Sequence, residues 1–365
     1  MSILTYKCPC CGSALAFSGT SEKLECASCG NSYEIEAIEA LAVEESSVSD
    51  IHFDMPTESF SETDAETMHA YVCENCGAEL VTDENTTATE CAYCGSPAVI
   101  PAKIEGGPKP EKVIPFVLSK DQATKLFEEY FKGKKLMPNI FLNTRNRIAE
   151  IRKLFVPYWL FDCDAYANMT FSAQKTSTTR SGDYIIHRTR HYLVRRAGSL
   201  GFDDIPVDGS TRLDDKIGES LEPYDLTKAI DFKPAVLAGA MADHADVDAE
   251  LCQKRAIQRV ENSIAQAMRN TVVGYSSVSV RSSNIKSEGG KITPVLMPVW
   301  LITTEKVVDG QKKTYTFAIN GQTGELTCDV PPDKGKATAW FFGVFLGIAA
   351  VGILIVVLLS MMGVF

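Results

Sequence analysis

Eight of the twelve cysteines fall into two sets that share one spacing. In each set, two CxxC pairs are separated by fourteen residues, and the second set lies 65 residues after the first. Four thiolates spaced in this way are typical of tetrahedral zinc sites. The predicted Zn2+ ligands are Cys8, Cys11, Cys26 and Cys29 in the first set and Cys73, Cys76, Cys91 and Cys94 in the second.

A glycine follows each CxxC pair, as expected for a tight knuckle whose next residue needs a positive φ. Four thiolates complete the coordination of zinc, so neither site has an open position for a catalytic water. We therefore predict two structural zinc ribbons, in which metal binding supplies on the order of 10 kcal/mol of folding free energy each. Within the motif CPCC, Cys10 is an alternative ligand to Cys8, and the spacing shared by the two sets favours Cys8.

The remaining cysteines Cys163, Cys252 and Cys328 stand alone and are predicted to be core residues. No thioredoxin-like strand–helix–strand pattern surrounds the CxxC pairs, which argues against a redox role. Thiolate ligands need a reducing compartment, and the N-terminus lacks the basic and apolar regions of a signal peptide. Both features predict that the N-terminal part lies in the cytoplasm.

Residues 339–365 contain no charged side chain. A helix of this length extends roughly 40 Å, more than the ~30 Å hydrocarbon core of a bilayer. We predict one transmembrane helix in the inner membrane. Because Lys334 and Lys336 precede the span, the body is expected on the cytoplasmic side. Gly343 and Gly347 form a GxxxG motif, which would allow a homodimer in the membrane.

The net charge of −11 is unevenly distributed. Residues 24–102 contain 17 Asp and Glu and no Lys or Arg, whereas residues 103–365 carry 34 basic and 29 acidic side chains. An acidic N-terminal third repels phosphates, so protein partners are favoured there over nucleic acid.

Residues 37–69 are acidic and show no sustained helical or strand period, which predicts a flexible linker. The segment IHFDMPTESF at 51–60 mixes aromatic and acidic residues and is an alternative candidate for a docking motif. His52 and His69 are predicted to be solvated, because both sets of metal ligands are already complete.

The body at residues 103–330 is predicted to be an antiparallel α+β domain. Ser119 is the expected N-cap of a helix at 120–131. The longest helix of the body is expected at 247–270, and a third helix at 145–155. The helix at 247–270 is predicted to turn five residues toward the core: Leu251, Ile257, Val260, Ile264 and Met268.

Strands are predicted at 113–118, 158–172, 184–195, 235–241, 277–284, 296–306, 313–319 and 325–328. Asn320 and Gly321 are expected to form the turn of the last hairpin. A strand followed by a helix occurs in both halves, and VPYWL at 156–160 resembles MPVWL at 297–301. These similarities suggest an internal duplication of the body.

Candidate catalytic residues are scarce. On the strand at 184–195, His187 and His191 face one side, with Arg188 and Arg190 on the other. This strand is either a solvated polar surface or, with Arg195 and Arg196, a basic cluster for anionic lipid headgroups. The chain has no GxxxxGK[ST] phosphate loop. We therefore predict that it is not an enzyme.

The predicted domains are a zinc ribbon at 1–36, a linker at 37–69, a second ribbon at 70–102, the body at 103–330, a juxtamembrane linker at 331–338 and a transmembrane helix at 339–365.

The CxxCG knuckles, the PxWL segments, the NGQTGE hairpin at 320–325 and the terminal apolar segment resemble a family of bacterial tail-anchored membrane proteins with TFIIB-type zinc ribbons. Such proteins are sometimes described as related to the primosomal helicase PriA, a description that the absence of a Walker A motif does not support. The resemblance implies a membrane scaffold, with SPFH (flotillin-like) or phage-shock-type membrane stress proteins as partners.

We therefore expect a non-enzymatic, membrane-anchored adaptor whose zinc ribbons recruit proteins. One alternative is a membrane-tethered nucleic-acid-binding regulator, which would need a basic ribbon face. Another alternative is an enzyme with its site in the body. A pocket that contains His187 and His191 would favour this alternative.

Overall fold

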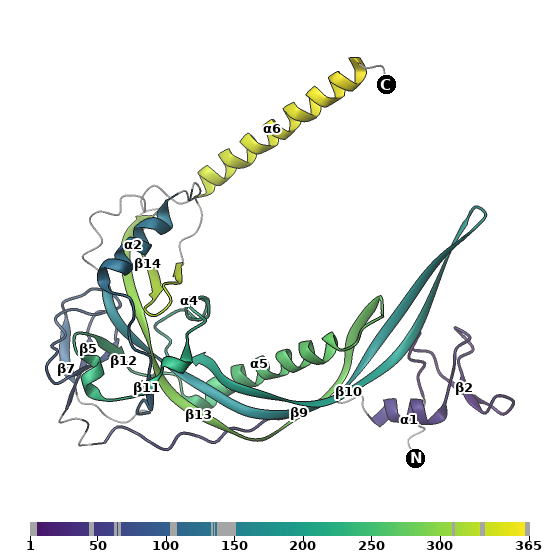
Figure 1. Ribbon diagram of the computed structural model, residues 1–365, viewed down its shortest axis with the longest axis horizontal. Coiled ribbons are helices and arrows are strands. Elements are labelled where there is room, and N and C mark those ends of the chain that lie inside the picture. The colour runs from purple at the N-terminus through teal and green to yellow at the C-terminus, as the bar shows by residue number, and fades with distance from the viewer. Residues whose placement is uncertain are drawn as a thin grey trace. The chain divides into compact units, whose positions relative to one another are not determined.

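The computed structural model describes residues 6–43, 47–61, 64, 67–102, 108–132, 134, 136, 151–308, 311–328 and 333–361. The chain divides into two compact units, whose elements are labelled in Figure 1. Unit 1 contains residues 1–56, 160–207 and 249–292, and unit 2 contains residues 57–159, 208–248 and 293–365. Three long strands contribute to both units: β9 (Arg152–Ser181), β10 (Tyr184–Asp208) and β13 (Ser277–Val308).

The first cysteine set of unit 1 belongs to a small antiparallel sheet with the order β1-β2-β3. These strands are β1 (Ala16–Ser18), β2 (Lys23–Glu25) and β3 (Ser32–Tyr33), and helix α1 (Ile35–Val43) follows. Leu24 and Ile38 form a small buried cluster against which Tyr6, Leu15 and Tyr33 pack. The apolar core of this ribbon is therefore very small.

Helix α5 (Ala249–Asn270) belongs to unit 1 and buries one face. Cys252, Ala256, Val260, Ile264 and Met268 recur every four residues on that face. Leu251 was predicted to be a core residue, but 57% of it is exposed. The prediction was wrong because the buried stripe runs through Cys252 and Ala256, whose small side chains carried a weaker signal.

The structure also differs from the predicted flexible linker at 37–69. Strand β4 (Val48–Asp50) pairs in parallel with β13, and α1 covers the start of the segment. Within unit 1, Ile51 and Phe53 are buried, and the Phe53 ring lies 5.0 Å from that of Phe161, edge to face. These two apolar side chains order a segment that composition alone indicated to be mobile.

The strands of unit 2 belong to a twelve-stranded sheet, in which eight strands form the path β11-β8-β13-β9-β12-β6-β5-β7 and the other four branch from it. The short ones are β5 (Met68–Cys73), β6 (Glu79–Asp83), β7 (Val99–Ala102), β8 (Lys112–Val113), β11 (Ile230–Asp231) and β12 (Met241–Asp243). β14 (Gln311–Asn320) and β15 (Leu326–Cys328) continue from β13 as antiparallel partners. Asn320 and Gly321 stand at the β14–β15 turn, as predicted.

The body is not purely antiparallel, so that part of the prediction was wrong. β8 is parallel to β13, with Val113 opposite Leu296, and β12 is parallel to β9, with Ala242 opposite Phe155. Neither parallel pair consists of consecutive strands, because other elements separate β8 from β13 and β9 from β12 along the chain, so no tight hairpin fixes these pairs as antiparallel. The chain is therefore a mixed α+β protein.

Three predicted elements have a different structure over part of their length. The strand predicted at 113–118 is shortened to β8, which ends at Val113. The predicted helix at 145–155 is wrong over residues 152–155, where β9 has already begun, and residues 145–150 lie outside the described residues. In the predicted strand at 235–241, residues 235–237 belong to a 3-10 helix, η5 (Pro234–Leu237), which has proline at its start, and only Met241 is in a strand, β12. In β9, Leu154 and Phe155 are buried, which favours a strand of the sheet over the predicted helix at these residues.

Helix α2 (Lys120–Phe131) begins where it was predicted. The Ser119 hydroxyl accepts from the Gln122 N–H, and the Gln122 side chain accepts from the Ser119 N–H, which makes a complete capping box. Among the described residues, unit 2 also contains the short helices α4 (Asp215–Ser220) and η4 (Leu226–Lys228).

Helix α6 (Lys334–Met361) is one continuous helix. Its stretch from Lys334 to Leu358 is long and apolar enough to cross a membrane, and none of it is buried within the protein. An apolar helix without a covering partner is expected to lie in lipid rather than in water.

Two tryptophans of unit 2 make matching hydrogen bonds. The indole N–H of Trp159 on β9 donates to the carbonyl of Val247 at 3.0 Å, and that of Trp300 on β13 donates to the carbonyl of Leu118 at 3.1 Å. Val247 and Leu118 both stand two residues before the start of a helix. The two PxWL segments therefore hold corresponding positions.

Two glycines repeat the pattern. Gly209, after β10, donates its N–H to the carbonyl of Pro157 at 2.9 Å, and Gly321, after β14, donates to that of Pro298 at 2.8 Å. The carbonyl of Gly209 accepts from the N–H of Val247, and that of Gly321 accepts from the N–H of Leu118. The sequences VDGST at 207–211 and INGQT at 319–323 thus occupy matching turns.

Candidate metal centres

The four CxxC knuckles have one geometry. The glycine after each knuckle has a φ between 71° and 73°, and its N–H donates to the carbonyl of the first cysteine of the pair at 2.7–3.0 Å. The glycines are Gly12, Gly30, Gly77 and Gly95. Positive φ at these positions explains why glycine follows each pair in the sequence.

The structure brings the predicted cysteines together in two groups of four, and within each group all sulfur atoms lie within 4.8 Å of one another. Cys8 and Cys29 have sulfur atoms 3.6 Å apart, and Cys76 and Cys91 have sulfur atoms 3.6 Å apart. Tetrahedral zinc with bonds of about 2.3 Å requires sulfur atoms roughly 3.8 Å apart. Both groups therefore fit a metal ion of that size, and Cys10 belongs to neither group.

Two thiols of the second group have pKa values shifted in opposite directions. Burial raises the pKa of Cys76. Burial opposes ionisation of Cys94 as well, but hydrogen bonding, first of all from the Asn75 amide, lowers its pKa to about 7. A divalent cation would offset the repulsion among four neighbouring thiolates.

The two groups differ in their surroundings. In the first, Cys11 and Cys29 are exposed, and the Tyr33 hydroxyl lies 3.5 Å from the sulfur of Cys8. In the second, Cys73 and Cys91 are fully buried. Strands β5, β6 and β7 of the second ribbon belong to the large sheet, in which β6 pairs with β12. The second ribbon is therefore an integral part of unit 2, whereas the first has a sheet of its own.

Two arginines of unit 2 contact the knuckles of the second ribbon. The Arg212 guanidinium donates to the carbonyls of Cys76 and Gly77 at 2.5 and 2.6 Å. Arg152, at the start of β9, donates to the Glu90 carboxylate at 2.9 Å. A methyl group at Gly95 would come within 2.7 Å of the Arg152 guanidinium, so this knuckle packs directly on the arginine.

A buried carboxylate lies beside the same ribbon. The hydroxyls of Tyr93, inside the Cys91–Cys94 knuckle, and of Ser210 donate to Asp243 Oδ2 at 2.6 and 2.5 Å. Burial raises the pKa of Asp243 to about 7, although both hydrogen bonds favour its charged form. No local pattern in the sequence connects the cysteines to Tyr93, Ser210, Arg212 or Asp243, so these residues were not predicted.

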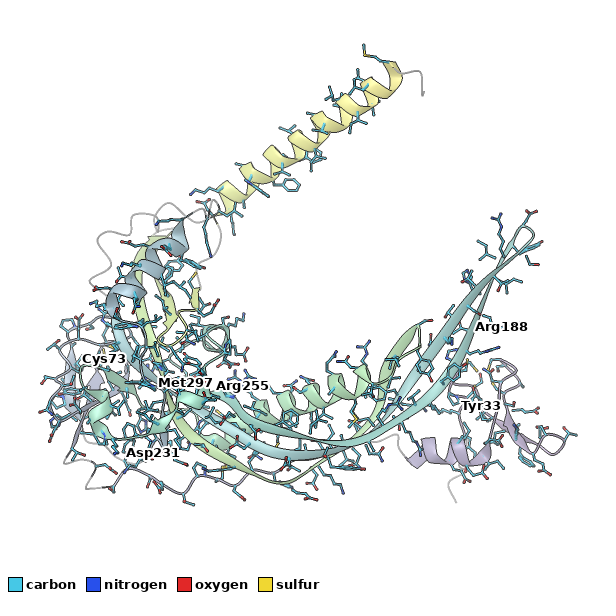
Figure 2. The ribbon with its side chains drawn as sticks, viewed as in Figure 1. Tyr33, Cys73, Arg188, Asp231, Arg255 and Met297 are labelled. Atoms are coloured by element: carbon cyan, nitrogen blue, oxygen red, sulfur yellow. The ribbon has the colours of Figure 1, made fainter. Side chains whose placement is uncertain are left out.

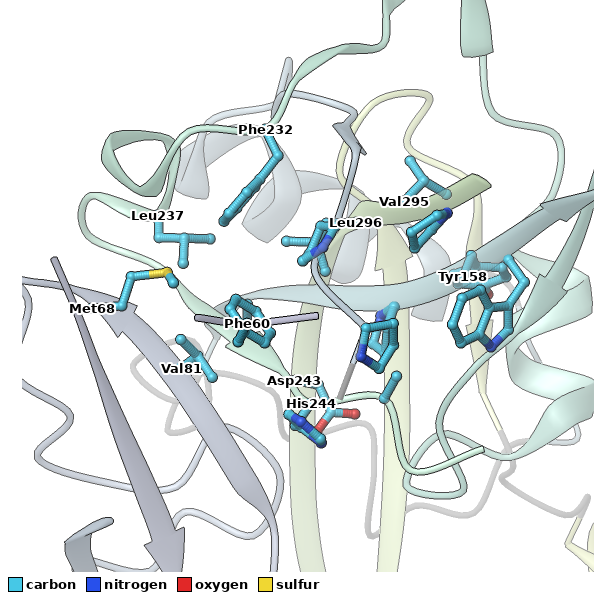
Figure 3. Close-up of a pocket in the computed structure, with 17 residues that line it drawn as sticks. Phe60, Met68, Val81, Tyr158, Phe232, Leu237, Asp243, His244, Val295 and Leu296 are labelled. Carbon is cyan, nitrogen blue, oxygen red and sulfur yellow. The ribbon is translucent and has the colours of Figure 1, made fainter. Parts of the chain in front are cut away.

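A small pocket of about 30 Å³ lies within unit 2, next to Asp243. Figure 3 shows Phe60, Phe232 and Leu237 among the apolar side chains that line it, with Asp243 and His244 at its edge. This volume is enough for about one water molecule. Phe60 comes from the candidate docking motif at 51–60, and it packs against the core of unit 2.

The other candidate residues belong to neither group of four cysteines. His187 and His191 are both exposed on β10. The ring of His187 forms a hydrogen bond of 2.9 Å with the Thr178 hydroxyl of the facing strand. Of the three single cysteines, Cys163 and Cys252 are buried, and Cys328 is partly buried beside the Tyr130 hydroxyl. Gly343 and Gly347 lie on α6 with open space around them.

Over 344 residues the chain is 34% identical to YdjG of Bacillus subtilis (strain 168), which is described as an uncharacterized protein. The match covers 94% of both chains. The chain belongs to the YdjG family. Identity at this level over nearly the full length implies that YdjG shares the fold described above. No protein-family model and no solved structure matches the chain.

Proposed function

We propose that this member of the YdjG family is a non-enzymatic adaptor, anchored in the membrane by α6, whose first zinc ribbon recruits protein partners. The contrast between the two ribbons carries the proposal. The second ribbon is built into unit 2, so its zinc would serve stability. The first ribbon has its own three-stranded sheet and almost no core, so stability of a larger unit does not explain it.

The surface of the first ribbon suits a protein rather than a nucleic acid. Phe17 on β1 is 58% exposed, and exposed aromatic side chains are frequent at the centre of protein interfaces. Residues 6–43 contain five acidic and two basic side chains. Bound zinc with four thiolates would add further negative charge, which disfavours contact with phosphates.

The test is affinity capture of the full chain from detergent-solubilised native membranes, followed by mass spectrometry. Phe17→Ser removes the exposed ring and leaves the zinc ligands in place, and a double Cys26→Ser, Cys29→Ser variant removes the metal. Val117→Ser is the matched control, because Val117 is 64% exposed but belongs to unit 2. We expect one set of proteins to be lost with both ribbon variants and retained with the control.

Recovery of the same proteins with all variants would contradict the adaptor function of the first ribbon. Nucleic acid in the captured material, lost with the ribbon variants, would favour the regulator instead. SPFH (flotillin-like) and phage-shock-type proteins are the partners that the resemblance to tail-anchored TFIIB-type ribbon proteins suggests, and the paired CxxCG knuckles support that resemblance.

We also propose a single-pass topology in the inner membrane with the body in the cytoplasm. Lys334 and Lys336 at the start of α6 support this orientation, as does the need of eight thiolates for a reducing compartment. Protease added to spheroplasts should leave the body intact, and protease added to inverted membrane vesicles should digest it. The opposite result would contradict the orientation.

We further infer that the body arose by duplication of a strand–helix–hairpin segment. The matching bonds of Trp159 and Trp300 and of Gly209 and Gly321 support this inference. The strand order supports it as well, because it is symmetric. The parallel pair β8–β13 has the antiparallel neighbour β11 beside β8, and the parallel pair β12–β9 has the antiparallel neighbour β6 beside β12.

A further inference from the structure

The outer part of the β9–β10 hairpin, which we call the arm, is defined as residues 175–196. Every residue from 175 to 193 is exposed, although the strands are regular up to the turn at Gly182 and Asp183. Figure 2 shows Arg188 on this hairpin. Val194 at the base of the arm is buried, but the regular hairpin beyond it has no buried residue and so has no role in the core of unit 1.

The arm is strongly basic in an acidic protein. It carries six Lys and Arg and one Asp, which gives a net charge of +5, whereas the whole chain has a net charge of −11. The basic residues are Lys175, Arg180, Arg188, Arg190, Arg195 and Arg196. Arg196 is partly engaged, because its guanidinium donates to Thr271 at the base of the arm.

The end of the arm is apolar. Tyr184, Ile185 and Ile186 follow the turn directly and are 77%, 63% and 50% exposed. Three consecutive apolar side chains at the tip of an exposed hairpin are unfavourable in water and indicate contact with an apolar phase or partner.

Cross-strand contacts fix the faces of the arm. The hydroxyls of Thr176 and Thr189 lie 3.1 Å apart, and His187 lies 2.9 Å from the Thr178 hydroxyl. Alternation then places Ile186, Arg188 and Arg190 on the opposite face from His187. Arg188 follows Ile186 on that face by about 7 Å along the strand, so positive charge begins directly behind the apolar tip.

We propose that the arm binds the surface of an anionic bilayer, with Tyr184, Ile185 and Ile186 in the interface and Arg188 and Arg190 on lipid phosphates. An apolar tip backed by arginines matches the change from acyl chains to phosphates across the interface, where a tyrosine ring is also favoured. Nucleic acid or an acidic protein would account for the arginines but not for the exposed isoleucines. Helix α6 would hold the arm at a bilayer at high effective concentration.

The test is hydrogen–deuterium exchange of the full chain in nanodiscs, read at residues 182–190. One set of discs contains phosphatidylcholine alone, and the other contains about 30% phosphatidylglycerol as the anionic lipid. We expect exchange in the arm to slow by roughly threefold or more in the anionic discs, because insertion suppresses local opening of the hairpin. Both Arg188→Glu with Arg190→Glu and Ile185→Ser with Ile186→Ser should remove this difference.

All four substituted side chains are exposed, so the variants should fold. Lys228→Glu with Lys233→Glu is the matched control, because these lysines are exposed in unit 2, and it should retain the difference. Equal exchange in the two kinds of disc would overturn the proposal. So would full protection of the double serine variant, or protection that appears only when duplex DNA is added.

Discussion

The Tyr93 hydroxyl donates a hydrogen bond of 2.6 Å to the carboxylate of Asp243, across 150 residues of sequence. Tyr93 lies inside the Cys91–Cys94 knuckle, and Asp243 ends strand β12. This bond, together with the pairing of β6 with β12, links the second metal centre to the sheet of unit 2. Its strength depends on the charge of a carboxylate that is almost completely buried.

The stability of unit 2 should therefore depend on pH through Asp243. Its pKa is raised by burial from 3.8 to about 7, so between these values the folded protein holds a proton that the unfolded chain has lost. The stabilisation that this proton on Asp243 provides is complete below pH 4 and is lost as the pH rises through 7. Between about pH 5.5 and 8, we expect the free energy of unfolding of wild type, measured in urea, to fall by roughly 2 kcal/mol relative to that of Asp243→Asn.

Asp231→Asn is the control for this measurement, because Asp231 is exposed and its pKa is lowered by Lys112. Its titration falls below the range of the experiment, so this variant should follow wild type. Parallel pH curves for wild type and Asp243→Asn would show that Asp243 does not titrate in this range.

Arg212 should slow the release of metal from the second ribbon. Its guanidinium donates to two carbonyls of the Cys73–Cys76 knuckle, at Cys76 and Gly77. Arg212→Ala removes two hydrogen bonds of a charged donor, and because the side chain is solvent-accessible we expect a loss of about 1–2 kcal/mol. Zinc release to a chromogenic chelator should then be roughly tenfold faster for one of the two ions. Lys228→Ala serves as the control, and an unchanged release rate for Arg212→Ala would contradict the role.

Local patterns in the sequence predicted the parts of the structure that local interactions determine. The two cysteine groups, the N-cap Ser119 and the turn at Asn320 lie where they were predicted. The predicted apolar helix is present as α6, but it begins at Lys334, within the predicted juxtamembrane linker. Each depends on residues close together in the chain or on a repeated spacing.

Contacts between distant residues explain the rest. Arg212 and Cys76 are 136 residues apart, and no periodicity connects them. The segment at 51–60 is ordered by burial of Ile51 and Phe53, which composition could not indicate. β9 begins at Arg152 because its neighbours β12 and β13 pair with it, so tertiary context overrides a helical pattern.

Loss of zinc should have different consequences at the two centres. Cys73→Ser removes a fully buried ligand whose ribbon supplies three strands of the large sheet, so we expect the free energy of unfolding of unit 2 to fall by more than about 3 kcal/mol. Cys26→Ser should release one zinc ion and unfold only the first ribbon. Mass spectrometry of the metal content and thermal unfolding test both expectations, with Cys10→Ser as the control that retains both ions. Equal destabilisation by the two ligand variants would show that the second ribbon is not integral to unit 2.

The matching tryptophans should have matching energetic roles. Trp159→Phe and Trp300→Phe each remove an indole N–H and leave the carbonyl of Val247 or Leu118 without that donor, while the aromatic packing is largely kept. We expect each variant to lower the free energy of unfolding by about 1–2 kcal/mol. Because the two bonds share no residue and join different strands to different helix starts, the double variant should show nearly additive losses. If only one of the two variants has a lower free energy of unfolding, the two indole hydrogen bonds contribute unequally to stability, although their geometry is equivalent.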